Sequence, residues 1–171
     1  MFRMMIASMA AAGLASAATA QETKPSKRAE ERAALERKFV DVMTSAILEG
    51  SFTIDGRNSD KPPPKDKYII DTVQKSGGDV WVITARMVYG NVDVKLPVPV
   101  EVRWAGDTAV IMLTDVSLPG MQGKFSTRLL IDGDRYAGTW SHDKVGGHMW
   151  GKIKKQPAEP KAGESKEKSS N

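Results

Sequence analysis

Between residues 47 and 155 the chain alternates short runs rich in Val, Ile, Thr and Trp with turns that contain glycine. Two-residue turns of the Gly-Gly, Gly-Asn and Asp-Gly types join neighbouring antiparallel strands, because these residues adopt the positive φ that such turns require. The turns are Ser76-Gly77-Gly78-Asp79, Gly90-Asn91, Ala105-Gly106-Asp107, Asp132-Gly133-Asp134 and Gly146-Gly147. Their succession predicts an antiparallel meander of β-hairpins.

The turns can be tested against the apolar residues, since a two-residue turn fixes which residues of the next strand share a face. With the turns placed as above, one face collects most of the large apolar side chains and the charged residues fall on the other. The expected apolar face comprises, strand by strand, Leu48, Gly50, Phe52 and Ile54; Tyr68, Ile70 and Thr72; Trp81, Ile83, Ala85 and Met87; Val92, Val94 and Leu96; Val98, Val100, Val102 and Trp104; Ala109, Ile111 and Leu113; Phe125, Thr127, Leu129 and Ile131; Tyr136, Gly138 and Trp140; and Met149, Gly151 and Ile153. Pro97 is expected to interrupt its strand.

A sheet with one apolar face must close on itself or fold over to bury that face. Closure into a barrel also removes the exposed strand edges. The sequence therefore predicts a mainly β fold, an antiparallel up-and-down meander of about eight or nine strands that closes into a barrel over residues 47–155. A barrel of this size has a filled or narrowly hollow interior, and strand tilt and shear decide which.

Residues 26–46 are predicted to form one amphipathic helix before the barrel. The segment is rich in Ala, Glu, Arg and Leu and has no internal Gly or Pro. Its apolar residues recur at three- and four-residue steps and form one stripe with the residue that follows: Leu35, Phe39, Val42, Met43, Ala46 and Ile47. A helix docked on the barrel buries this stripe, while a coiled-coil arm and a membrane-surface helix are the alternatives. Acidic residues on the opposite face argue against the membrane.

The two ends of the chain have the composition of segments outside a folded domain. Residues 1–20 combine a short basic start, an apolar run and the small residues Ala18-Thr19-Ala20, which is typical of a signal peptide cleaved before Gln21. An N-terminal membrane anchor is the alternative, but the apolar run is shorter than the ~20 residues of a transmembrane helix, and no other segment reaches that length. Residues 21–25 are expected to be a flexible lead-in and residues 156–171 a disordered polar tail.

Composition narrows the class of protein. The chain has no cysteine, which excludes disulfides, thiolate metal ligands and a cysteine nucleophile. Its 25 basic and 21 acidic residues are interleaved, so no nucleic-acid interface is expected. Together with the signal peptide and the lack of Asn-x-Ser/Thr sequons, these features indicate a soluble, exported protein that is periplasmic or extracellular and bacterial.

Both histidines, His142 and His148, lie in one hairpin near the end of the meander. A tight turn at Gly146-Gly147 places the two imidazoles on opposite faces, whereas a looser loop over residues 143–147 would place them opposite each other as a candidate metal site. The tight turn agrees with the apolar face, so both histidines are interpreted as surface or structural residues and as weak metal candidates. No catalytic residue and no cofactor is assigned, because turn geometry explains the aspartates that sit at turns.

Two longer connections interrupt the meander. Residues 57–67 contain Pro62-Pro63-Pro64 among lysines and aspartates and are predicted to form a stiff, solvated connector. Residues 118–123 read Leu-Pro-Gly-Met-Gln-Gly and carry two large apolar side chains with two glycines. This connection is interpreted as an ordinary loop whose Leu118 enters the core, or as a lid over one mouth of the barrel.

The order of the elements resembles a known architecture. A helix, a first strand with Gly50-Ser51-Phe52, a long loop and a hairpin meander are similar to the calycin superfamily of lipocalin-like barrels, over residues 48–155. The Gly-x-Trp signature of that family is absent, since Phe52 stands where the family has Trp, so no ligand residue is carried over. Segments 136–140 and 146–151 resemble exported bacterial proteins of unknown function.

Three functions are compatible with these observations. The first is binding of a small apolar or amphipathic ligand inside the barrel, whose wall is then expected to include Phe52, Trp81, Trp104, Phe125, Tyr136 and Trp140. The second is a structural or protein-interaction domain with a packed interior, acting through an outer strip at Val110, Met112 and Val116. The third is a metal-dependent or hydrolytic enzyme that uses the hairpin of His142 and His148. A cavity favours the first function, and neither a protein partner nor an oligomeric state follows from the sequence.

Overall fold

The computed structural model describes residues 26–57, 60–89 and 91–157. The predicted signal peptide, the expected lead-in over residues 21–25 and residues 158–171 of the expected tail lie outside these ranges. The described residues hold no helix that has both the length and the apolar character of a membrane span.

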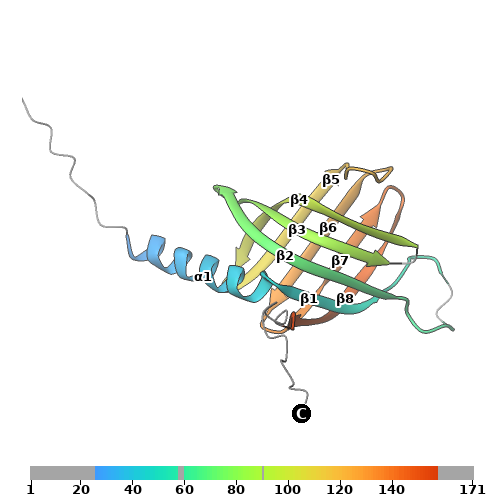
Figure 1. Ribbon diagram of the computed structural model, residues 1–171, viewed down its shortest axis with the longest axis horizontal. Coiled ribbons are helices and arrows are strands. Elements are labelled where there is room, and N and C mark those ends of the chain that lie inside the picture. Colours follow the sequence, from blue (N-terminus) through green and yellow to red (C-terminus); the bar gives the residue numbers. More distant parts are fainter. Residues whose placement is uncertain (1–25, 58–59, 90, 158–171) are drawn as a thin grey trace, which may run out of the picture.

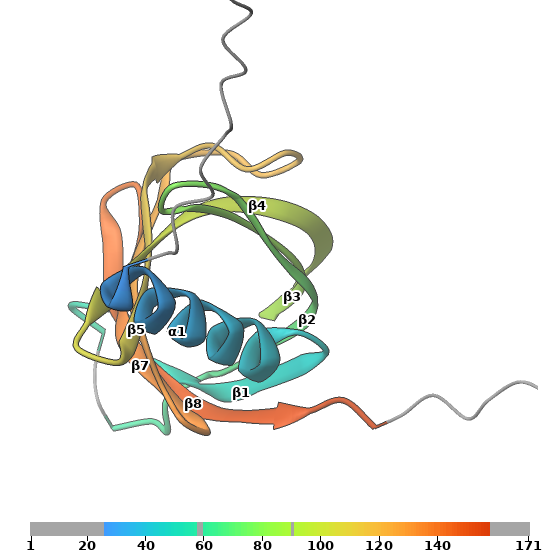
Figure 2. The same ribbon diagram turned by 90° about the vertical axis from the view of Figure 1, so that its left-hand side faces the viewer.

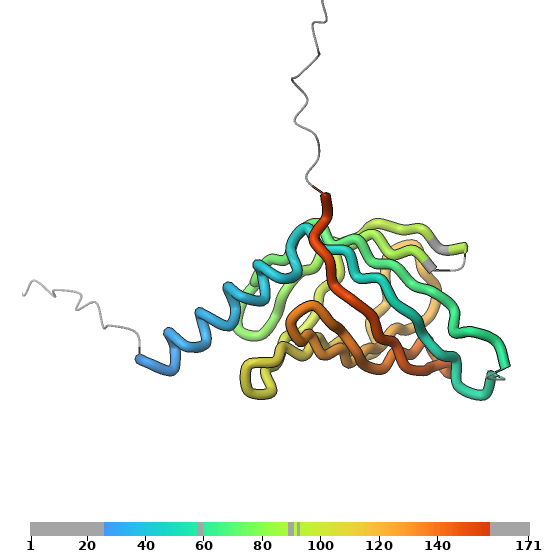
Figure 3. The backbone as a smooth tube through the Cα atoms, turned by 90° about the horizontal axis from the view of Figure 1, so that it is seen from below, coloured from blue at the N-terminus to red at the C-terminus, as the bar shows by residue number. Residues whose placement is uncertain are grey.

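Eight antiparallel strands follow one helix, and together they form a closed barrel (Figure 1). The elements are α1 (Lys27–Met43), β1 (Ala46–Phe52), β2 (Lys65–Gly77), β3 (Val80–Tyr89), β4 (Val92–Ala105), β5 (Thr108–Val116), β6 (Phe125–Asp132), β7 (Arg135–His142) and β8 (Val145–Lys155). Each strand pairs with the next along the chain, and β8 pairs with β1 to close the seam, where the two strands run side by side (Figure 3). The mainly β, up-and-down barrel expected from the turns is therefore confirmed, and its architecture is compatible with that of lipocalin-like barrels.

Two β-bulges change the expected faces. In β2 the register shifts between Ile70 and Thr72, so Val73 takes the buried position and Thr72 faces solvent. In β5 the register shifts between Leu113 and Val116, and Val116 packs against the core instead of continuing the outer strip. The assignments of Thr72 to the inside and of Val116 to the outside were wrong, because an extra residue in one strand reverses the alternation beyond it.

The sequence predicted that Pro97 interrupts its strand, but β4 continues through this residue. The backbone N–H of Val102 donates to the carbonyl oxygen of Asp79, the residue just before β3, so the N–H groups of alternate residues in β4 point to β3 and the nitrogens of Pro97 and Pro99 point the other way. Within the described part of the chain, β4 pairs with β5 from Glu101 to Ala105. The two prolines therefore lie where no strand on that side needs a donor, which is where a sheet tolerates proline.

The last hairpin turns at Asp143 and Lys144, not at Gly146-Gly147, because His142 pairs with Val145. Asp143 adopts a φ of 52°, which aspartate tolerates at turns. Relative to the predicted pairing, the partner of every residue in this hairpin is displaced by an even number of residues. The predicted faces of β7 and β8 are therefore correct although the predicted turn was wrong.

Helix α1 covers one end of the barrel (Figure 2). Ser26 caps its N-terminus, with Oγ accepting from the N–H of Ala29. Phe39 is buried edge-on against Trp81, with ring centroids 5.4 Å apart. A salt bridge of 2.8 Å joins Arg32 to Asp79 in the β2–β3 turn. The docked helix is confirmed, although it ends at Met43 and residue 46 already belongs to β1.

Candidate functional site

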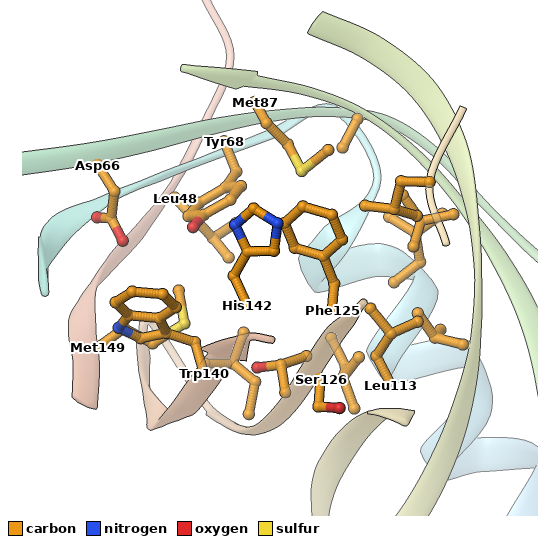
Figure 4. Close-up of a pocket in the computed structure, with 18 of the residues that line it drawn as sticks. Leu48, Asp66, Tyr68, Met87, Leu113, Phe125, Ser126, Trp140, His142 and Met149 are labelled. Atoms are coloured by element: carbon orange, nitrogen blue, oxygen red, sulfur yellow. The ribbon is translucent and has the colours of Figure 1, made fainter. Parts of the chain in front are cut away.

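The barrel encloses an apolar cavity of about 220 Å³. Its polar lining residues are Asp66, Tyr68, Ser126, Thr127, Ser141 and His142. The rest of the wall consists of apolar side chains, which converge from most of the strands (Figure 4). Met43, at the end of α1, lies at the closed end of this cavity and is 1% exposed. The side chain of His142 is 42% exposed, so solvent reaches the opposite end.

Three of the six expected wall residues line the cavity: Phe52, Phe125 and Trp140. Phe52 and Trp140 meet edge to face, with ring centroids 5.7 Å apart. The indole N–H of Trp140 donates to the backbone carbonyl of Thr53 at 3.1 Å, which fixes the ring against the first strand. These aromatic side chains come from β1, β6 and β7 and form a wall near the open end.

The other three expected residues do not line this cavity. Trp81 and Trp104 lie at the opposite end of the barrel beneath α1, where both pack against Phe39. Tyr136 is buried at the seam and is 2% exposed. Their side chains face inward as expected, but they lie at the helix-capped end or behind the wall.

A row of paired residues crosses four strands at the seam. Asp66 of β2 pairs with Gly50 of β1, Gly50 with Gly151 of β8, and Gly151 with Tyr136 of β7. The two glycines leave room for the ring of Tyr136: a Cβ on Gly50 would lie 2.3 Å from its hydroxyl. The Tyr136 hydroxyl thereby reaches across the row and donates to Oδ1 of Asp66 at 3.1 Å.

This buried pair holds its protons tightly. Burial is the main cause that raises the pKa of Asp66 above 3.8, and it outweighs the hydrogen bond from Tyr136, which acts in the opposite direction. Burial also raises the pKa of Tyr136, and the neighbouring Asp66 raises it further. Tyr136 therefore keeps its proton and acts as the donor in this pair.

The raised pKa predicts that the effect of Asp66 on stability depends on pH. The folded state binds the proton of Asp66 more tightly than the unfolded chain does, so this contribution is complete below the ordinary pKa of 3.8 and is lost as pH rises through the higher folded pKa. Asp66→Asn removes this titration. We expect the variant to gain stability relative to the wild type between about pH 3.5 and about pH 8, as measured by urea unfolding at each pH. Asp107→Asn, at an exposed turn, is the matched control, and a difference for Asp66→Asn that does not change with pH would refute the prediction.

His142 holds the connection between β5 and β6 against the mouth of the cavity. Its ring stacks on Phe125, with centroids 4.1 Å apart and planes inclined by 17°, and its Nε2 lies 2.7 Å from the carbonyl oxygen of Gln122. Nearby, the N–H of Lys124 donates to Oδ1 of Asp143 at 2.8 Å. Leu118 of this connection is buried and lines the cavity, and Met121 lines it as well.

The two histidines do not come together. His142 points into the cavity, whereas His148 is exposed on the outer surface one position before the buried Met149. Their opposite orientation agrees with the expectation, although the turn that produces it differs. In the described ranges no three His, Cys, Asp or Glu side chains gather as metal ligands would.

Asp66 is one of the polar wall residues that the sequence analysis missed, together with Ser126 and Ser141. It was assigned to a solvated connector over residues 57–67, but β2 begins at Lys65 and Asp66 is 4% exposed. Its flanking lysines made the segment look solvated. The alternation that places Tyr68 and Ile70 inside, continued two residues back, would have placed Asp66 inside as well.

Searches of protein-family models and of curated proteins find no match to this sequence.

Proposed function

We propose that this protein binds a small apolar or amphipathic molecule inside its barrel, in the manner of a lipocalin-like carrier, without catalysing a reaction. The observation that supports this proposal is the apolar cavity, which has an aromatic wall near its solvent-exposed end and a floor at the end of α1. Binding sites for small molecules are typically concave and apolar with a few polar groups that orient the ligand. The cavity has this composition.

The cavity volume limits the size of the ligand. An engineered cavity of about 150 Å³ in another protein accommodates benzene, while drug-sized ligands occupy roughly 300–1,000 Å³. The 220 Å³ of this cavity therefore suit a fused pair of aromatic rings or a short alkyl chain. We further propose that the protein is exported, on the strength of the signal-like residues 1–20.

A cavity-filling substitution tests this function. Ala85 lines the cavity and is 5% exposed, so Ala85→Leu adds atoms to the space that the ligand would occupy. 2-Methoxynaphthalene, a neutral fluorescent probe of two fused rings, should bind the wild type saturably and the variant about tenfold more weakly.

The matched control is Ala137→Leu, because Ala137 is an exposed alanine on the outer face of β7. Thermal unfolding of both variants verifies that they fold. Saturable binding with equal affinity for Ala85→Leu and Ala137→Leu would place the probe outside the barrel, and the absence of saturable binding to the wild type would reject the proposal.

A second candidate function, contact with another protein, is supported by one outer feature. Val110, Leu130, Ala137 and Trp150 are successive cross-strand partners on β5 to β8. Leu130 and Trp150 are 45% and 41% exposed, which is high for large apolar residues. Under this alternative Trp150→Ala would abolish the association of the protein with itself or with a partner and leave probe binding unchanged.

A further inference from the structure

We propose that the ligand carries a hydrogen-bond donor, a hydroxyl or an amine, and that the carboxyl group of Asp66 binds it. This inference rests on the proposed function and specifies the chemistry of the ligand. The protein would thus select apolar molecules with a donating head group over those that end in a carboxylate.

The first observation is an unused acceptor on the cavity wall. Asp66 lines the cavity and is 4% exposed, and its buried Oδ2 atom forms no hydrogen bond within the described residues, although the backbone N–H groups of Gly50 and of Asp66 itself lie near the carboxyl group. Its other oxygen, Oδ1, already accepts from the Tyr136 hydroxyl. A buried carboxyl oxygen without a partner is unfavourable, and a donor on a ligand would remove that cost.

The second observation is that the carboxyl group is held in place. The ring of Tyr136 lies against the Gly50–Gly151 pair, and a Cβ on Gly151 would lie 2.7 Å from that ring. The Asp66 carboxyl therefore has a fixed hydrogen-bond partner on one side and the cavity on the other. A preorganised polar group of this kind orients a ligand at low entropic cost.

The third observation is that the two lysines next to Asp66 in the sequence form their hydrogen bond and salt bridge with other residues. Lys65 donates to Oγ of Ser51 at 3.0 Å, and Lys67 forms a salt bridge of 3.0 Å with Glu49. Within the described ranges neither ammonium group forms a salt bridge with Asp66, although the charge of Lys65 acts on the carboxyl group. A cationic or neutral donor from the ligand can take the position that these lysines leave unfilled.

Three other polar side chains of the wall already have partners in the protein. The hydroxyl of Thr127 donates to the carbonyl oxygen of Thr139 at 2.8 Å. Ser126 donates to Oδ1 of Asp115, and His142 contacts the carbonyl oxygen of Gln122. Asp66 differs from these three in having a buried oxygen without a hydrogen-bond partner, which makes it a wall residue well placed to select a head group.

Competition between matched eight-carbon molecules tests the inference. Octan-1-ol, octylamine and octanoate should displace 2-methoxynaphthalene from the wild type at pH 8, with the alcohol or the amine at least about tenfold more effective than octanoate. If only octylamine is favoured over octanoate, the site recognises an ammonium head group. If octan-1-ol is as effective as octylamine, the site recognises a hydroxyl group.

Two variants and one control assign the preference to Asp66. Asp66→Leu removes both acceptors, and we expect the preference over octanoate to fall to about threefold or less. Asp66→Asn, which keeps the shape and removes the charge, should reduce the preference for octylamine most. Thr72→Val, a substitution of matched shape at an exposed position of the same strand outside the cavity, should leave the preference unchanged, and circular dichroism verifies that each variant folds.

The outcomes separate this inference from the proposed function. Probe binding with equal displacement by all three molecules, or a preference that survives in folded Asp66→Leu, would reject the role of Asp66 and leave the ligand-binding function standing. Failure of the wild type to bind the probe would reject the function itself and the inference with it.

Discussion

Gly151→Ala is expected to destabilise the barrel by about 4 kcal/mol, because the new methyl group has no space at the seam. Its Cβ would lie 2.3 Å from the carbonyl oxygen of Glu49 and 2.7 Å from the Cα of Gly50. Both atoms belong to the backbone of β1, which closes the barrel against β8. The strands must separate to relieve the overlap, and the ring of Tyr136, 2.7 Å away on the inner side, prevents the methyl group from moving inward.

Urea unfolding measures this loss, with Gly77→Ala as the matched control. A Cβ on Gly77 meets no atom within 4 Å, and this glycine does not have a positive φ. The control should therefore change stability by less than about 0.5 kcal/mol. Equal stabilities for the two variants would show that the seam is looser than the paired glycines indicate.

The glycines of the strands and turns explain where the sequence analysis succeeded and where it failed. Turn chemistry and alternation together were sufficient to predict the meander, because a wrong face would have buried charged residues. Gly146 and Gly147 were misread as a turn, however, although a Cβ on Gly147 would lie only 2.1 Å from the carbonyl oxygen of Thr53. Glycine serves both tight turns and close backbone approach, and one sequence does not distinguish the two uses.

The two β-bulges could not be predicted from the sequence, for a different reason. At Thr72 and Val116 the local alternation continues smoothly in the sequence, and the extra residue becomes apparent only when the partner strand is known. Asp115 has a φ of 51° and is held by Ser126 of the neighbouring strand. Such a tertiary contact has no signature in the short stretch around Asp115.

The candidate site was predicted in part. The aromatic residues were assigned to the correct face, but not to the correct end of the barrel. In an up-and-down meander successive turns lie at alternate ends, so Trp81 and Trp104, next to the turns near α1, lie far from Phe52 and Trp140. That ordering was available from the predicted meander. The volume of the cavity was not, because it depends on strand tilt and shear.

The second large effect is expected at the end of the barrel that α1 covers, where Phe39→Ala should destabilise the protein by about 3–5 kcal/mol. Phe39 is 3% exposed and contacts two indole rings edge to face, at 5.4 Å from Trp81 and 6.3 Å from Trp104. Truncation removes a large buried ring and both aromatic contacts, and it leaves a void between α1 and the barrel. Differential scanning calorimetry should show a decrease in Tm of about 10–20 °C.

Arg37→Ala on the exposed face of α1 is the control for helix propensity. It should shift Tm by no more than about 2 °C. The comparison also decides whether α1 is part of the barrel or an independent arm, because an arm would tolerate Phe39→Ala as well as it tolerates Arg37→Ala. Since Met43 at the end of the same helix lines the cavity, loosening α1 should also weaken binding of 2-methoxynaphthalene. A Phe39→Ala variant that unfolds at the wild-type temperature would contradict the docking of α1 as the floor of the cavity.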